Sequence, residues 1–181
     1  MILSHRRDTK YHPDLILSIT QPKTFLLSNI RGLLGQGGNS KTGFLFDQAV
    51  SHQASIVTET WLKPEVKDSE LLVNFPGYSL FRCDRQKRRG GGVCAFICDD
   101  ISAECIGTYD NGVCELLVLK IHSLNTIVAL LYRPPDTRLS EFSPVLSELE
   151  KILSDMPSPA PTICMHMPDC FAYPHLAASL G

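Results

Sequence analysis

The amino-acid sequence predicts an α/β (α+β) domain in which two packed β-sheets carry helices on their outer faces. Three features support this prediction: an early strand–helix–strand unit, a central series of short apolar runs, and a late amphipathic helix. Helices that flank an antiparallel meander bury their apolar sides when two sheets pack together and the helices cover them. Composition fits one such domain, because 44% of the 181 residues are hydrophobic and the length allows one sizeable core.

The early unit begins with the apolar run Thr24–Ile30, which reads TFLLSNI and brings Asn29 to a strand end. A glycine-rich loop and a capped helix over about residues 41–52 follow this strand. The β-branched run Ala54–Thr58 is the second strand, and Glu59 comes directly after it. Strand, helix and strand in this order predict a crossover between two parallel strands.

The central part of the chain predicts an antiparallel meander. A turn at residues 75–78 leads into a strand through Phe81, and four further apolar runs follow at short spacing. Turn residues separate most of these runs, which is the pattern of strands joined by hairpins. The four runs are residues 93–98, 101–108, 114–122 and 126–132.

The late helix lies between a cap at Ser140 and the proline-rich stretch that starts at Pro157. Its apolar side chains recur at helical spacing over Phe142–Leu153. Thr162–Met165 then begins one more strand, and turn residues and small apolar residues follow it. The predicted organisation is a leader or linker over residues 1–23, a partial domain over residues 24–165 and a divergent tail over residues 166–181.

Charge and cysteine content restrict the class of protein. The formal net charge is -2, so any affinity for nucleic acid must come from a local cluster of positive charge. Seven cysteines are an odd number, and most lie in apolar runs, which favours a reduced protein inside the cell, nuclear or cytoplasmic. No apolar run approaches the ~18 residues of a membrane span, so no membrane association is expected.

Three polar residues at strand ends are candidates for chemistry: Asn29, Glu59 and Tyr132. A carboxylate is an oxygen ligand suited to Mg²⁺, an amide can orient phosphate or water, and a phenol can hydrogen-bond a phosphoryl oxygen. Polar residues are also common at strand ends without any such role. Each residue taken alone therefore leaves both interpretations open.

A basic loop is the second candidate site. Five cationic residues stand against the single acid Asp84, immediately before three glycines, and such a loop suits contact with a DNA backbone. The alternative is an ordinary solvated surface loop. The five residues are Arg82, Arg85, Lys87, Arg88 and Arg89.

Several motifs, taken in order, resemble one known family. The segments SNIRG, IVTETWL, FPGYSLFRCDR, RRGGGV, CELLVLKI and LLYRPP are similar to the endonuclease domain of non-LTR (LINE-type) retrotransposons, within the endonuclease/exonuclease/phosphatase (DNase I-like) superfamily. The resemblance runs from about Phe25 to Met165. It implies a four-layer sandwich, with two mainly antiparallel sheets between helices.

The resemblance also implies roles for the candidate residues. Glu59 would be the Mg²⁺ ligand, Asn29 the amide near metal and phosphate, and Tyr132 the phenol beside the scissile phosphate. The implied activity is Mg²⁺-dependent nicking of DNA for target-primed reverse transcription. The partner would be the DNA backbone, gripped in part by the basic loop, and the parent element would carry a reverse transcriptase.

The sequence departs from the family pattern after the late helix. The family strand ends there in Gly-Asp-Phe-Asn, which positions and activates the attacking water, whereas this chain reads TICMHMPDC from Thr162 to Cys170. The family's later segments, with a further Asp and a catalytic His, have no counterpart before Gly181. We therefore expect a domain that is incomplete at its C-terminus and impaired in cleavage. The alternatives are a non-catalytic remnant that binds nucleic acid and a phosphatase of the same superfamily.

Overall fold

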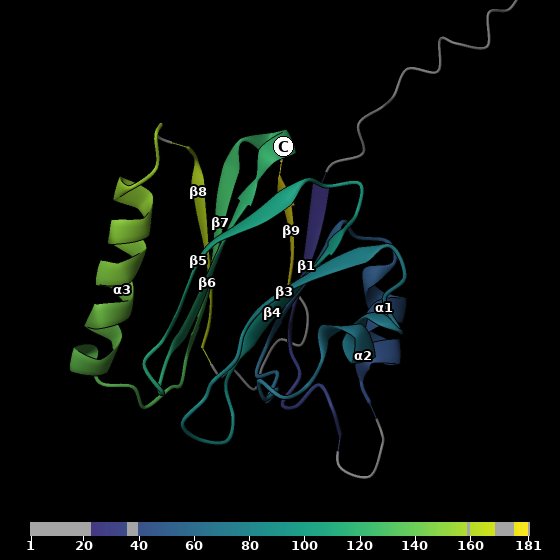
Figure 1. The fold of residues 1–181 in the computed structure, drawn as a ribbon, viewed down its shortest axis with the longest axis horizontal. Helices are drawn as coiled ribbons and strands as arrows, with labels where there is room; N and C mark the ends of the chain where they lie inside the picture. Colours follow the sequence, from purple (N-terminus) through teal and green to yellow (C-terminus); the bar gives the residue numbers. More distant parts are fainter. Residues whose placement is uncertain (1–22, 36–39, 159, 169–175, 181) are drawn as a thin grey trace, which may run out of the picture.

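Two β-sheets packed face to face form the centre of the computed structural model, which describes residues 23–35, 40–158, 160–168 and 176–180. Figure 1 shows four layers, with α1 and α2 outside the first sheet and α3 outside the second. The predicted fold class is confirmed. The first sheet has the order β3-β4-β2-β1-β9 and comprises β1 (Lys23–Asn29), β2 (Ala54–Thr58), β3 (Tyr78–Cys83), β4 (Val93–Cys98) and β9 (Leu176–Leu180).

The second sheet is built mainly from one antiparallel meander. Its order is β5-β6-β7-β8, and its strands are β5 (Ala103–Asp110), β6 (Glu115–Ile121), β7 (Thr126–Arg133) and β8 (Thr162–Pro168). The helices are α1 (Thr42–Ala49), α2 (Asp68–Leu72), the short 3-10 turn η2 (His122–Leu124) and α3 (Leu139–Ser154). None of the helices within the described residues is long and apolar enough to cross a membrane.

The predicted crossover is present. Strands β1 and β2 pair in parallel from Phe25 opposite Ala54 to Asn29 opposite Thr58, with α1 between them in sequence. Parallel neighbours end at the same edge of a sheet. Asn29 and Glu59 therefore leave the first sheet side by side, which is what places the candidate site.

The expected four-strand meander is wrong in one respect. The structure places β4 in the first sheet, where it pairs with β2 and β3, so that only β5, β6 and β7 form the meander. The physical reason is burial on both faces of β4. Ala95 faces the second sheet while Phe96 faces the helices and stacks on Phe75, with the ring centroids 3.8 Å apart. An apolar run of this kind does not reveal which sheet the strand joins.

The main core lies between the two sheets. Side chains from the first sheet, such as Phe25 and Ile56, meet Leu117 and Leu119 of β6 there. The intervening residues Leu116 and Val118 face α3 instead. Because both faces of β6 are covered, its sequence is apolar at nearly every position rather than alternating.

Three further elements differ from the sequence-based expectation. The five-residue helix α2 falls in a segment for which no helix was expected, and Leu71 is its one fully buried residue. Strand β8 continues past Met165 to Pro168, and β9 pairs antiparallel with β1. Residues 166–168 and 176–180 of the predicted tail therefore belong to strands, while the predicted domain boundaries themselves stay predictions.

Candidate functional site

The ends of β1 and β2 bring two of the three candidate residues together. Asn29 is the last residue of β1, and Glu59 follows the last residue of β2. Tyr132 lies across the interface in β7, where its side chain is buried in the core between the sheets. The guanidinium of Arg85 lies 5.5 Å from the centroid of the Tyr132 ring. Asn29 and Glu59 therefore come from the first sheet, and Tyr132 comes from the second.

Glu59 is held in one orientation by two hydrogen-bond donors. Its Oε2 atom accepts hydrogen bonds from the indole N–H of Trp61 and from the backbone N–H of Gly91, the latter at 3.4 Å. Only 7% of Glu59 is exposed. Glu59 and Trp61 have φ values of 59° and 53°, in the left-handed region that L-residues rarely adopt. Such strain persists only where surrounding contacts enforce it.

Backbone hydrogen bonds on both sides enforce this turn. On one side, Gly32 and Leu33 donate to the carbonyls of Glu59 and Thr60 at 2.7 and 2.8 Å. On the other side, Thr60 and Trp61 donate to the carbonyls of Gly92 and Gly91 at 3.3 and 2.9 Å. A Cβ atom on Gly92 would lie 2.4 Å from the Thr60 hydroxyl, and the φ of Gly92 is 85°. This position therefore requires glycine.

Asn29 has an unusual environment. Its side-chain amide is buried, yet neither the nitrogen nor the oxygen has a hydrogen-bond partner within the part of the chain that the structure describes. An unsatisfied buried amide is costly, and one in a folded protein points to a water, ion or ligand that completes it. Because Asn29 lies next to Glu59, a group that hydrogen-bonds its amide would belong to the same site.

The donor set fits Mg²⁺ only in part. Glu59 offers one carboxylate and Asn29 one amide oxygen, both hard ligands. Among the described residues, no three His, Cys, Asp or Glu side chains lie close enough together to hold a metal ion. Mg²⁺ often binds through one or two carboxylates, with waters and substrate phosphates as its other ligands. The residues present would therefore hold the ion mainly together with a phosphate group.

A basic groove of about 950 Å³ adjoins the turn that carries Glu59. Trp61 lines the groove, and the guanidinium of Arg89 lies 5.0 Å from the centroid of its ring. Among the described residues that line the groove, seven are cationic and one, Glu65, is acidic. The cationic residues are Arg31, Lys41, Lys63, Arg85, Lys87, Arg88 and Arg89.

Comparison of the sequence with family models and with curated proteins finds no match. Solved structures do match. The AP endonuclease LMAP from Leishmania major has a TM-score of 0.53 and 15% identity over 91% of this chain and 59% of that chain. A Bacteroides thetaiotaomicron protein described as an endonuclease/exonuclease/phosphatase family protein has a TM-score of 0.56 and 12% identity over 81% and 62% of the two chains. The chain has the endonuclease/exonuclease/phosphatase fold.

The endonuclease domain of TRAS1, a telomere-specific non-LTR retrotransposon, shares this fold with the chain. Its TM-score is 0.53 at 15% identity, over 81% of this chain and 60% of that domain. The resemblance to this superfamily that the motifs indicated is confirmed at the level of the fold. The chain spans about 60% of the length of the structures it matches.

Within the endonuclease/exonuclease/phosphatase fold, the five basic residues of the predicted loop separate into two groups. Lys87, Arg88 and Arg89 are exposed and line the groove. Arg82 instead pairs with Asp68 at 3.1 Å and donates to the Val66 carbonyl at 2.7 Å.

Arg85 is also held by protein groups, because it is buried and forms an ion pair with Glu115 at 2.5 Å. A guanidinium held by a carboxylate inside the protein is a poor phosphate contact. Arg82 and Arg85 therefore have acidic partners within the protein, and contact of the five basic residues with DNA stays a prediction.

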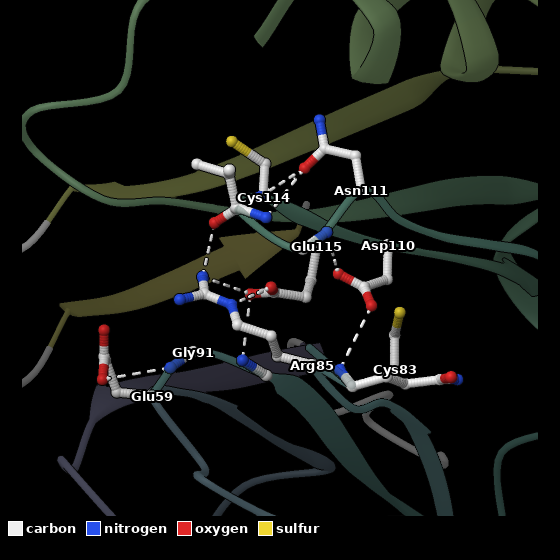
Figure 2. A network of polar contacts seen from close by, with 12 residues as sticks. Glu59, Cys83, Arg85, Gly91, Asp110, Asn111, Cys114 and Glu115 are labelled. Carbon is white, nitrogen blue, oxygen red and sulfur yellow. Dashed lines mark hydrogen bonds and ion pairs between the residues drawn. The ribbon is translucent and has the colours of Figure 1, made fainter. Parts of the chain in front are cut away.

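Glu115 is the residue of this site that sequence reasoning missed. It begins β6, is fully buried, and lies opposite Tyr132 in the sheet. Figure 2 shows the Glu115 carboxylate facing the guanidinium of Arg85, which donates hydrogen bonds to it. The backbone N–H of Gly92 also donates to this carboxylate. Burial raises the pKa of Glu115, while the hydrogen bond and charge of Arg85 oppose that shift. The available signal was one charged residue at the start of the apolar run ELLVLKI.

Strand β8, as far as the structure describes it, contains no acidic residue. Strand β8 reads TICMHMP, and its register places Met167 opposite Tyr132 and Pro168 opposite Arg133. The strand therefore reaches the level of the site without a carboxylate or an amide side chain. This agrees with the departure from Gly-Asp-Phe-Asn in the sequence.

Proposed function

We propose that this chain is a nuclease-type domain of retroelement origin that binds the DNA backbone in its basic groove and holds Mg²⁺ at Glu59, with weak cleavage of its own. The observation that carries the proposal is the placement of Glu59. A nearly buried carboxylate is fixed by Trp61 and Gly91, and the same Trp61 lines a groove with six cationic residues besides the paired Arg85. The proposed parent reaction is Mg²⁺-dependent nicking of DNA to leave a 3′-hydroxyl that primes reverse transcription.

Each group of the site has a distinct task in this proposal. Lys87, Arg88 and Arg89 neutralise phosphate charge along the groove. Glu59 and the Asn29 amide orient the scissile phosphate from the side where the metal would bind. The Tyr132 phenol remains the expected hydrogen-bond donor to a phosphoryl oxygen. The bound metal would polarise that phosphate and assist the leaving oxygen.

The proposal of weak cleavage rests on β8. In-line attack on a phosphodiester needs an oriented nucleophile as well as charge stabilisation. The end of β8 presents Met167 where the family pattern places an acid and an amide. Backbone binding needs neither group, and we therefore expect binding without efficient cutting.

A non-catalytic DNA-binding remnant is the second candidate, and the same strand favours it. A phosphatase of the superfamily is less well supported, because a phosphomonoester needs few charges, whereas many cationic residues line the groove. A polyanion makes use of charges spread along a surface. The two candidates that bind DNA differ only in their response to Mg²⁺ and Glu59.

A nicking assay separates them. Supercoiled plasmid incubated with the chain and Mg²⁺ should be nicked slowly at most, relative to an EDTA control. Loss of that slow nicking in Glu59→Gln would support a weak enzyme. Identical traces for the wild type, Glu59→Gln and the EDTA control would leave the non-catalytic candidate, and fast wild-type nicking would contradict the proposed impairment.

A binding assay tests the groove. The variant Lys87→Ser/Arg88→Ser should weaken binding to a labelled DNA duplex and lower the slope of log K against log salt by about 2, since each lost phosphate contact removes about 0.9. The matched control Lys120→Ser/Lys151→Ser removes the same charge from β6 and α3 and should leave the slope unchanged. Equal slopes in both variants would exclude the groove as the binding surface.

A further inference from the structure

We propose that Glu115 is a positioning residue, which closes the loop of residues 84–92 and thereby fixes both Glu59 and the cationic tip of that loop. The relevance of this device to DNA rests on the proposed function, whereas its geometry does not. Glu115 lies on the second sheet, whereas Glu59 follows the first. The inference is that one buried carboxylate, which never touches substrate, sets the shape of the site from across the sheet interface.

Glu115 accepts hydrogen bonds from both ends of the loop. At the beginning of the loop, the Nε and Nη2 atoms of Arg85 donate to Glu115 at 2.5 and 3.1 Å. At the end of the loop, the backbone N–H of Gly92 donates to Glu115 Oε2 at 2.9 Å. Arg85 is tied down further by the carbonyl of Val113 at 2.5 Å. The exposed tip, Lys87–Arg89, is thus held between two anchors on one side chain.

Close packing connects this anchor to Glu59. Gly91 has a φ of 70°, and a Cβ atom there would lie 2.3 Å from Arg85 Cζ, so its backbone rests directly against the guanidinium. The same Gly91 donates its N–H to Glu59 Oε2 and accepts the N–H of Trp61. A shift of Arg85 therefore moves Gly91, and with it one of the two donors that hold the Glu59 carboxylate.

The loop tip completes the connection. Arg89 lies over the ring of Trp61, whose indole N–H is the second donor to Glu59. Both donors to Glu59, and the cation above one of them, thus depend on the conformation of one loop. A second tie, from the N–H of Gln86 to Asp110 Oδ2 at 3.2 Å, holds the loop to the second sheet near its exposed edge.

The chemistry of the Arg85–Glu115 ion pair favours a positioning role over a purely structural one. A buried ion pair is often no more stabilising than well-packed apolar side chains, because desolvation offsets its attraction. Apolar side chains could not accept three hydrogen bonds from two separate segments. What the carboxylate provides beyond stability is a fixed distance between Arg85 and Gly92.

Tryptophan fluorescence tests the inference without DNA or metal, because Trp61 is the sole tryptophan of the chain. In Glu115→Leu, the acrylamide quenching constant of Trp61 should rise at least about twofold, with a shifted emission maximum. Glu115→Gln keeps an acceptor and should lie close to the wild type. The control Asp68→Asn removes one of the two acidic partners of Arg82 and should leave Trp61 unchanged.

Circular dichroism must show that the variants are folded. If Glu115→Leu does not fold, Glu115→Asp decides the question, since it keeps the charge and withdraws the carboxylate from Gly92. A folded Glu115→Leu or Glu115→Asp variant with wild-type Trp61 spectra and quenching would overturn the inference.

DNA binding gives a second readout. A change in loop geometry should weaken DNA binding, whereas loss of a negative charge should strengthen it. Glu115→Asp preserves net charge and should weaken duplex binding about threefold or more. The variant Glu104→Gln, on β5, is the control for charge. It removes one negative charge far in sequence from the loop, so a charge effect alone would strengthen its DNA binding. Unchanged DNA affinity of Glu115→Asp, despite altered Trp61 quenching, would overturn the part of the inference that concerns the loop tip.

This arm also separates the two proposals. A wild-type chain that binds no DNA contradicts the proposed function, while the fluorescence experiment still decides whether Glu115 positions Glu59.

Discussion

The ends of β2 and β8 differ sharply, although both strands lead toward the same side of the sandwich. Beyond β2, Glu59 is enclosed by hydrogen bonds from Trp61 and Gly91, on a turn pinned from two sides. In β8, Met167 stands opposite Tyr132, and the described residues of this strand include no acid. Under the proposed function, the part of the site that binds metal and the part that activates the nucleophile would be built by different strands, so that one could be intact without the other.

The largest effect is expected when the Asp and Asn side chains of the family pattern are introduced at the end of β8. Replacing residues 166–169 by Gly-Asp-Phe-Asn keeps the register and places the new Asp opposite Tyr132. We expect Mg²⁺-dependent plasmid nicking to rise by about 10²-fold or more, the usual contribution of a positioned general base. The gain should disappear when Glu59→Gln is added. No gain in a folded variant would mean that β8 is not what limits cleavage.

The second test compares two ion pairs beside the same loop. Glu115→Leu leaves the guanidinium of Arg85 buried without its carboxylate and should lower the free energy of unfolding by about 3–5 kcal/mol. Asp68→Asn breaks the more exposed pair with Arg82 and should cost less than about 1 kcal/mol. Urea unfolding measures both.

A double replacement sharpens this comparison. Arg85→Met/Glu115→Leu removes both charges at once and should recover much of the stability that Glu115→Leu loses. If the double variant is no more stable than Glu115→Leu, the cost does not arise from an unpaired buried charge.

The third test concerns two glycines with positive φ. Gly77 has a φ of 78° and open space around it, so Gly77→Ala should cost only the backbone strain of about 1–2 kcal/mol. Gly92 has a similar φ of 85°, but the new methyl group would meet the Thr60 hydroxyl. Gly92→Ala should therefore cost at least about 1 kcal/mol more. Equal losses in thermal or urea unfolding would show that the turn at Glu59 can relax.

The mildest test leaves the fold unchanged and probes exposure by thiol labelling. Cys164 of β8 is exposed, whereas Cys83 of β3 is buried. Burial raises the pKa of Cys83 to about 12. At pH 8 the labelling of Cys83, followed by mass spectrometry, should be at least about a hundredfold slower than that of Cys164, because the thiolate is the reactive form. Comparable rates would mean that the sheets open readily.

Much of the fold could be predicted because its signals are local. The crossover from β1 to β2 and the helix α3 each follow from spacing and turn residues within one short segment. The sheet that β4 joins could not be predicted, because a strand buried on both faces has no alternation to read. Helix α2 was missed for a related reason, since five residues with one fully buried side chain give no helical period.

The site divides in the same way. Asn29 and Glu59 could be placed from sequence because parallel strand ends meet at one edge. The burial of Arg85 against Glu115 could not be predicted. The two residues are 30 positions apart, and no residue near Arg85 indicates the contact. Arginines at positions 85 and 88 look alike in the sequence, and only the folded chain distinguishes them.

Closure of the loop by a single side chain has a consequence for how such a domain can evolve. Arg85 and Gly92 carry the attachment, and Gly91 and Arg89 contact Glu59 and Trp61, so the exposed positions 87 and 88 are those that can change without disturbing the turn at Glu59. Under the proposed function, the contacts with DNA could then change at this short exposed segment while the Glu59 carboxylate keeps its position. Grafting tips from other chains between these two anchors would be the corresponding route for redesign.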